Sequence, residues 1–198
     1  MDWLIIFKNK YMNNDKKIKV LGIAGSLRKG SFAKALLENA KKLVPENMEL
    51  ESFDISSIPV FNQDDENNFS EDVKLFKAKI KEADAILFVT PEYNYSIPGV
   101  LKNAIDTASR PYGDNSWEDK PVAIMSSSMG MLAGSRAQYH LRQVFVFLDM
   151  HALNRPEVMV PNAQEKFDDK LILTDEKTKE AISNQLKALD VWTRRLID

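Results

Sequence analysis

The chain has 198 residues, a formal net charge of −2 and no cysteine. The length suits one domain with a full hydrophobic core, and the small net charge argues against a nucleic-acid or anionic-membrane partner. The lack of cysteine excludes disulfides, thiolate nucleophiles and cysteine-ligated zinc or iron–sulfur centres. His140 and His151 lack the spacing of a metal-binding motif, so we expect no metal.

Residues 1–16 are predicted to form a peripheral extension. The apolar run over residues 3–7 is too short to span a bilayer, and no small-residue cleavage site follows it. We therefore place one domain at residues 17–198 and expect a cytoplasmic protein.

Along that domain, apolar runs typical of strands alternate with amphipathic segments typical of helices. Strands are predicted at residues 18–24, 48–55, 85–90, 121–127 and 157–160, and helices at 32–43, 71–82, 99–108, 134–148 and 174–196. This alternation predicts an α/β fold, with a doubly wound five-stranded parallel sheet between two layers of helices. In such a sheet, ligands bind beyond the carboxyl ends of the strands.

The loop after the first predicted strand, residues 25–31, reads Gly-Ser-Leu-Arg-Lys-Gly-Ser. A strand that leads through small residues into a helix directs several backbone N–H groups and the positive end of the helix dipole at one place. Ser26 and Ser31 add hydroxyl donors there, and Arg28 adds a guanidinium. The loop is therefore predicted to bind a phosphate.

The kind of phosphate follows partly from what the loop lacks. A nucleoside triphosphatase would carry lysine after Gly30, where this chain has Ser31, and the dinucleotide fingerprint does not follow Gly22 and Gly25. A single terminal phosphate, as on a mononucleotide such as FMN, fits the loop best. The alternative is an ordinary strand-to-helix turn with Ser26 or Ser31 as the N-cap.

Two further loops follow the third and fourth predicted strands and so belong to the same edge of the sheet. Residues 91–99 are rich in aromatic rings and proline, which suits the edge of a planar heterocycle. Residues 126–130 are small and let the backbone approach a ring. Each loop alone could be a surface turn, but three of them at one edge favour a binding site.

With these loops the chain resembles the NADPH-dependent FMN reductase family of flavodoxin-like quinone, chromate and azo reductases. The most specific block is Thr-Pro-Glu-Tyr-Asn-Tyr-Ser-Ile-Pro-Gly at residues 90–99; residues 25–32, 101–106 and 136–143 add to it. The similarity extends from Lys17 to Leu196, and it implies a flavodoxin-like fold that binds FMN.

The resemblance also implies which residues form the FMN site. The phosphate would be held by Ser26, Arg28 and Ser31, with the backbone amides of Phe32 and Ala33. The isoalloxazine would be lined by Pro91, Glu92, Tyr93 and Asn94, and the pocket would be closed by Ser127 and Gly130. Relatives usually carry asparagine at the position of Ala33, so we expect FMN to bind more loosely here.

The chemistry implied by the resemblance is hydride transfer from NADPH or NADH to flavin N5, followed by reduction of a quinone, chromate, an azo compound or free flavin. We interpret Glu92 and Tyr93 as pocket walls, because an exposed loop carboxylate is more often solvated than catalytic. Two alternatives stay open. One is a flavodoxin-like FMN electron carrier that does not oxidise NAD(P)H, against which Arg28 and the modest net charge weigh. The other is a flavin-free regulatory domain on the same fold.

The predicted helix at 134–148 carries more apolar residues than one core-facing stripe requires, namely Tyr139, Leu141, Val144, Phe145 and Leu148. The surplus predicts a homodimer or a homotetramer of two dimers, and the resemblance implies flavin pockets completed across the dimer. The alternative is that one subunit buries all five residues. His140, on the same helix, is predicted to be a packing or interface residue.

Overall fold

The computed structural model describes residues 16–197, so the predicted extension lies almost entirely outside the described residues. Its parallel sheet has the strand order β2-β1-β3-β4-β5, and β6 also pairs with β4. The strands are β1 (Ile18–Ala24), β2 (Met48–Phe53), β3 (Ala85–Thr90), β4 (Pro121–Ser127), β5 (His151–Ala152) and β6 (Val158–Val160). This is the predicted flavodoxin-like α/β fold.

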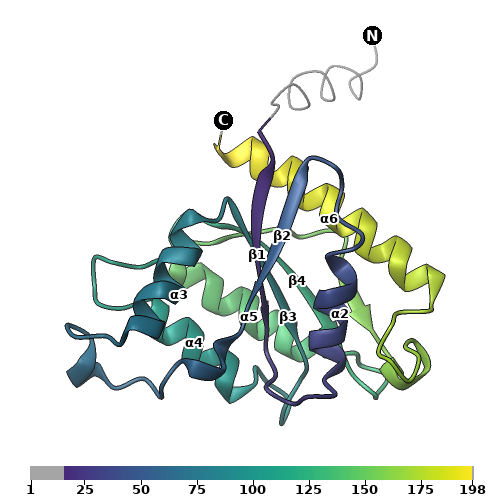
Figure 1. The fold of residues 1–198 in the computed structure, drawn as a ribbon, viewed down its shortest axis with the longest axis horizontal. Coiled ribbons are helices and arrows are strands. Elements are labelled where there is room, and N and C mark those ends of the chain that lie inside the picture. Colours follow the sequence, from purple (N-terminus) through teal and green to yellow (C-terminus); the bar gives the residue numbers. More distant parts are fainter. Residues whose placement is uncertain (1–15, 198) are drawn as a thin grey trace.

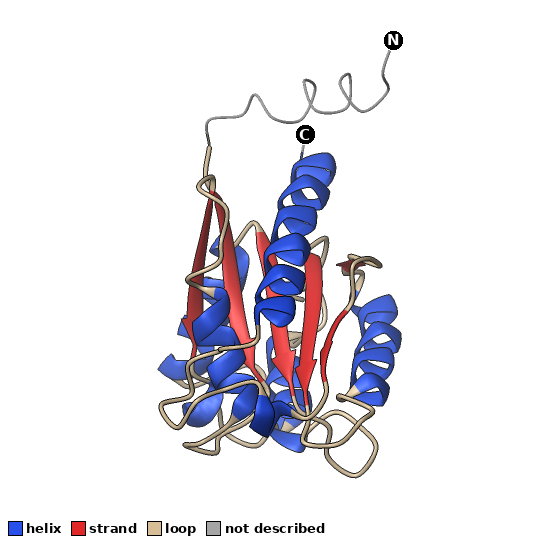
Figure 2. Cartoon of the chain, turned by 90° about the vertical axis from the view of Figure 1, so that its right-hand side faces the viewer, coloured by secondary structure: helices blue, strands red, loops and turns tan. Residues whose placement is uncertain are grey.

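Helices cover both faces of the sheet (Figures 1 and 2). They are α2 (Phe32–Ala40), α3 (Glu71–Glu82), α4 (Gly99–Ala108), α5 (Ser135–Leu148) and α6 (Glu176–Ile197). One hydrophobic cluster joins the sheet to α2 and α6, and a second joins its other face to α3, α4 and α5. Within residues 16–197, no helix has the length and apolarity needed to cross a bilayer.

The two central strands are buried along their whole length, which explains their apolar sequences. Every residue of β3 and β4 is buried, and successive side chains enter the two hydrophobic clusters alternately. The edge strand β2 is only partly buried, and in its first four residues apolar side chains alternate with glutamates. All strands run in the same direction (Figure 2), so the loops after β1, β3 and β4 lie at one edge of the sheet.

The prediction of a single fifth strand at residues 157–160 was incomplete. Two short strands, β5 and β6, pair with different parts of β4. Between them, the Gln185 side chain of α6 donates hydrogen bonds to the carbonyls of Ile124 and Pro156, at 3.1 and 2.7 Å. A two-residue strand leaves no periodic pattern, so β5 could not be recognised from the sequence.

Several predicted element ends differ from the observed ones. The first helix stops at Ala40 instead of residue 43, because a tighter turn follows in which Leu43 N donates to Ala40 O. Strand β2 ends at Phe53, since Asp54 caps a 3₁₀ helix over Ile55–Ser57. A second 3₁₀ helix, Gln63–Asp65, lies between β2 and α3, where no helix or strand was predicted.

Asp175 caps α6 and makes this helix sensitive to acid. Its carboxylate accepts hydrogen bonds from Thr178 N and Thr178 Oγ1 at 2.9 and 2.7 Å and from Lys166 Nζ at 2.9 Å. Led by the Thr178 hydroxyl, these bonds lower the pKa of Asp175 from 3.8 to about 2.

We expect Asp175→Ala to destabilise the chain by about 1 kcal/mol at neutral pH, the usual effect of losing an N-cap. The wild-type carboxylate is stabilising above its unfolded pKa of 3.8, and this contribution is lost as the pH falls through the folded value of about 2. Thermal unfolding from pH 7 to pH 2 should therefore show the difference between the two proteins shrinking below pH 4. A difference that stayed constant with pH would contradict this assignment.

Candidate functional site

The loop after β1 lies against the end of β3. Gly25 N donates to Val89 O at 2.8 Å. A side chain at Gly25 would bring its Cβ within 2.8 Å of Thr90 Oγ1 and 2.9 Å of a Leu101 methyl group, so glycine permits this close approach. The loop is thereby held beside the carboxyl end of the neighbouring strand.

The amino end of α2 closes this loop. Ser31 is the N-cap, and its Oγ accepts a hydrogen bond from Lys34 N at 3.3 Å. The Ser31 hydroxyl hydrogen is thus left to donate elsewhere. The amides of Phe32 and Ala33 lie ahead of the first intrahelical bond, Ala35 N to Ser31 O, so they have no acceptor within the helix. Ser31 acts both as the predicted N-cap and as a wall of the cavity described below.

The remaining side chains of the phosphate loop differ in exposure. Ser26 is buried, and its Oγ lies 3.4 Å from Arg28 N. The Arg28 side chain is exposed, with its guanidinium carbon 5.9 Å from the centroid of the Phe32 ring. The arginine therefore stands at the mouth of the loop, close to the free amides of α2.

The loop after β3 makes a tight turn over residues 93–96. Tyr93 N donates to Ser96 O at 3.1 Å, and Ser96 N donates to Tyr93 O at 2.9 Å. The central residues Asn94 and Tyr95 both have positive φ, 49° and 66°. This is the pattern of a type I′ turn. The turn directs the loop back toward α4.

Glu92 lines the cavity described below, in keeping with its interpretation as a pocket wall, but its carboxylate is bound by the protein instead of being solvated. Its Oε2 accepts hydrogen bonds from Arg136 N and Ala137 N, at 3.0 and 3.3 Å, and its Oε1 pairs with Arg136 Nη1 at 3.1 Å. Gly134 precedes α5 and has no capping side chain, so the carboxylate from the neighbouring loop takes that place at the positive end of the helix. Glu92 lines the site but is fully engaged by α5.

The loop after β4 is tied to the start of α5. Ser126 Oγ donates to Ala133 O at 2.6 Å and accepts from Gln138 Nε2 at 2.8 Å. The neighbouring Ser127 hydroxyl is buried and has no hydrogen-bond partner among the described residues. A buried hydroxyl without a partner is costly, and this one belongs to a residue that lines the cavity described below.

These three loops enclose one cavity of about 230 Å³. It is lined by Ser26, Arg28, Ser31, Phe32, Ala33, Pro91, Glu92, Tyr93, Ser127, Ser128 and Met129. Of the residues predicted for the site, only Asn94 and Gly130 do not line it: Asn94 is exposed in the turn, and Gly130 follows Met129 at the rim.

Ser128 and Met129 line the cavity but were not among the predicted site residues. Their only signal was their place in the small-residue loop at 126–130. Met129 is also 64% exposed, so it forms an apolar wall that is open to solvent.

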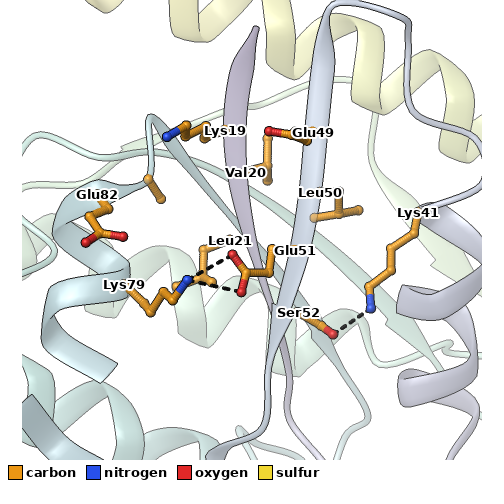
Figure 3. A pocket seen from close by; sticks show the side chains of 11 residues that line it. Lys19, Val20, Leu21, Lys41, Glu49, Leu50, Glu51, Ser52, Lys79 and Glu82 are labelled. Carbon is orange, nitrogen blue, oxygen red and sulfur yellow. Dashed lines mark hydrogen bonds and ion pairs between the residues drawn. The ribbon is translucent and has the colours of Figure 1, made fainter. Parts of the chain in front are cut away.

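A larger cavity, of about 520 Å³, lies elsewhere, along β1 and β2 between α2 and α3 (Figure 3). Two of its lysines are engaged: Lys79 pairs with Glu51 at 3.2 Å, and Lys41 pairs with Glu38 and donates to Ser52 Oγ, at 2.7 and 2.6 Å. None of the predicted site residues lines it. We therefore take the smaller cavity as the candidate functional site, because donors without a partner among residues 16–197 converge there.

The structure places His140 near this site. Its Nδ1 lies 2.9 Å from Ser96 Oγ, at the end of the turn after β3. This contact joins α5 to the loop, and the role of His140 as a packing or interface residue stays a prediction. No residue of the described chain forms part of a cluster able to hold a metal ion.

The chain resembles known proteins over most of its length. Residues 18–165 match the family model described as NADPH-dependent FMN reductase. An NAD(P)H-dependent FMN reductase of Pseudomonas aeruginosa is 54% identical, covering 90% of this chain and 97% of its own. A quinone reductase of Escherichia coli K12 is 41% identical, covering 91% and 98%, respectively.

A solved structure agrees with these sequence matches. The flavoenzyme NAD(P)H:(acceptor) oxidoreductase FerB from Paracoccus denitrificans superposes with a TM-score of 0.84 at 34% identity, covering 90% of this chain and 98% of its own. The structural match and the sequence matches therefore indicate the same kind of protein. The chain belongs to the NADPH-dependent FMN reductase family.

Proposed function

We propose that the chain is an FMN-dependent oxidoreductase, which passes a hydride from NADPH or NADH through bound FMN to a quinone or a similar small acceptor. Chromate, azo compounds and free flavin belong to the same class of acceptor. The observation that carries the proposal is the single cavity between the three loops, which has phosphate-binding chemistry at one end and a proline and an aromatic residue at the other. Family membership supports the same activity.

The residues present fit FMN. At the phosphate end, Ser26, Arg28 and Ser31 stand around the unpaired amides at the start of α2. At the other end, Pro91 and Tyr93 offer an apolar wall to a planar ring system. The Ser127 hydroxyl, buried without a partner among the described residues, would donate to or accept from a polar atom of the ligand.

When bound, FMN supplies the hydride-accepting and hydride-donating chemistry. The work of the chain is to hold the phosphate, to orient the ring and to leave one side of the site open for reactants. Glu92 binds α5 through both carboxylate oxygens, so it is not available as a general base. None of the side chains that line the cavity is therefore assigned the role of a nucleophile or a base.

Ala33 is the residue at which this site departs from the family pattern. It lines the cavity and is 1% exposed, and its methyl group belongs to the hydrophobic cluster under α2. An asparagine in its place would add a polar grip on the phosphate region, but it would have to displace part of that apolar packing. FMN affinity of Ala33→Asn, measured by titrating apoprotein, shows which effect is larger.

The experiment for the main proposal has two readouts. Heat denaturation should release a yellow compound that chromatographs as FMN, in about one equivalent per chain, because the cavity holds one phosphate site. The reconstituted protein should then consume NADPH or NADH when a benzoquinone is added. FAD, or no flavin after reconstitution, would overturn the cofactor assignment. Bound FMN without NAD(P)H consumption would favour the electron-carrier alternative.

We further propose that the chain forms a homodimer or a homotetramer. Leu141, Phe145 and Leu148 of α5 are buried within the subunit, but Tyr139 and Phe147 are 51% and 79% exposed. The surplus apolar surface of α5 is therefore carried partly by residues other than those expected from the sequence. Exposed aromatic residues are typical of interface centres.

The cytoplasmic location likewise stays a prediction from the sequence.

Light scattering at micromolar concentration should give a mass of at least twice 22.6 kDa. Phe147→Ser should shift the mass toward the monomer, since it removes an exposed aromatic ring from the proposed interface. Lys187→Ser, a polar change on α6, should leave the mass unchanged. A monomeric wild-type protein with full activity would contradict the assembly and the shared pocket together.

A further inference from the structure

The turn after β3 contains a residue in an unfavourable backbone conformation. Both central positions of a type I′ turn need positive φ, which asparagine accepts and glycine prefers. Asn94 meets this requirement at 49°, but Tyr95 stands at 66°, a conformation that a bulky side chain rarely adopts. Such a residue persists where its surroundings hold it, and it is found most often at functional sites.

Arg136, the second residue of α5, provides that hold. Its guanidinium carbon lies 3.9 Å from the centroid of the Tyr95 ring, as in a cation–π pair. The same guanidinium pairs with Glu92 at 3.1 Å, on the other side of the turn. One side chain, 44 residues from Glu92 in the sequence, thus contacts both the residue that precedes the turn and the second central residue of the turn.

We propose that Arg136 is a positioning residue for the FMN site, which keeps the turn over residues 93–96 in its left-handed form. The residues just before and at the start of that turn, Pro91, Glu92 and Tyr93, form one wall of the cavity. Arg136 itself does not line the cavity. It acts through the turn, because the backbone position of the wall depends on the turn that follows it. The inference rests on the proposed function only in naming FMN as the ligand.

The structure supplies a substitution that should remove the need for this arginine. Tyr95→Gly converts the centre of the turn to Asn-Gly, the favoured pair for a type I′ turn. Glycine adopts positive φ without steric cost, so the turn no longer needs the ring to be held. The two changes should therefore be coupled, which a double-mutant cycle measures.

Two readouts test the coupling: the FMN dissociation constant of the apoprotein, and hydrogen exchange of the Tyr93 and Ser96 amides without flavin. We expect Arg136→Gln to weaken FMN binding about tenfold, the scale of a cation–π pair plus an ion pair, and to accelerate both amides. Tyr95→Gly should bind FMN within about threefold of wild type, as expected for an unstrained turn. The double variant should resemble Tyr95→Gly alone. Arg136→Lys, which keeps the charge but not the planar ring contact, should lie between wild type and Arg136→Gln, and it replaces Arg136→Gln if that variant does not fold.

Arg110 is a matched control. It forms the same kind of group, with Glu66 at 2.7 Å and the exposed Tyr112 ring at 3.7 Å, away from the cavity. Arg110→Gln should leave FMN affinity and both amides unchanged. The inference is overturned if Arg136→Gln binds FMN like wild type, or if its defect persists in full beside Tyr95→Gly. If the wild type itself binds no FMN, the proposed function fails, and the amide exchange still decides the role of Arg136.

Discussion

Trp117→Ala should lower the free energy of unfolding by about 3–5 kcal/mol, the range found when a large aromatic side chain is removed from a core. Trp117 is completely buried. Its ring packs edge-on against Phe76 at a centroid distance of 5.8 Å and against Phe88 at 5.5 Å. Its indole N–H also donates to Ile105 O at 2.9 Å. Alanine would leave a cavity and remove one of the two hydrogen bonds that the Ile105 carbonyl accepts, the other being from Ser109 N at 3.2 Å.

Urea unfolding followed by circular dichroism measures this loss. Trp117→Phe is the matched variant: it keeps most of the ring volume and removes the hydrogen bond, so it should cost less than alanine. Tyr112→Ala removes a ring that is 79% exposed and should change stability by about 0.5 kcal/mol at most. A loss below about 1 kcal/mol for Trp117→Ala would show that the cluster under α3, α4 and α5 closes around the gap.

The burial of Trp117 was not predicted from the sequence, for a reason that applies to other residues as well. It lies between α4 and β4, in a segment without apolar periodicity, so nothing local marks it as buried. Its burial follows from the way three helices meet over β3. By contrast, β3 and β4 were predicted with their observed bounds, because burial on both faces requires a continuous apolar run.

In the site, too, the features that a local sequence pattern marks differ from those that arise only when distant segments pack together. Its three loops could be predicted, since each follows a recognisable strand and parallel strands place their carboxyl ends at one edge. The engagement of Glu92 by Arg136 could not be predicted, because it joins residues 44 apart that only the packing of α5 brings together. Electrostatic roles of this kind depend on the fold, so the residue type alone indicated a pocket wall but not the partners of the Glu92 carboxylate.

Arg28→Ala should weaken FMN binding by about 1.5–3 kcal/mol, the contribution of a charge-assisted hydrogen bond, which corresponds to about 10- to 150-fold in the dissociation constant. The Arg28 side chain lines the cavity beside the amino end of α2, so it can reach a phosphate held by the amides of Phe32 and Ala33. Being exposed, it has little role in folding, and the thermal stability of the apoprotein should stay unchanged.

Two substitutions at neighbouring residues show whether the loss of FMN affinity comes from the overall positive charge of the loop or from the contact of Arg28 with the phosphate. Lys29→Ala removes an adjacent, exposed cation that does not line the cavity, so it should weaken FMN binding much less than Arg28→Ala. Ser31→Ala removes a neutral donor, so it should also cost less in affinity, but it deletes the N-cap of α2 and should lower stability by about 1 kcal/mol. High salt should reduce the difference between wild type and Arg28→Ala, because an exposed ionic contact is screened. Equal losses for Arg28→Ala and Lys29→Ala would mean that the loop attracts the phosphate only through its overall charge.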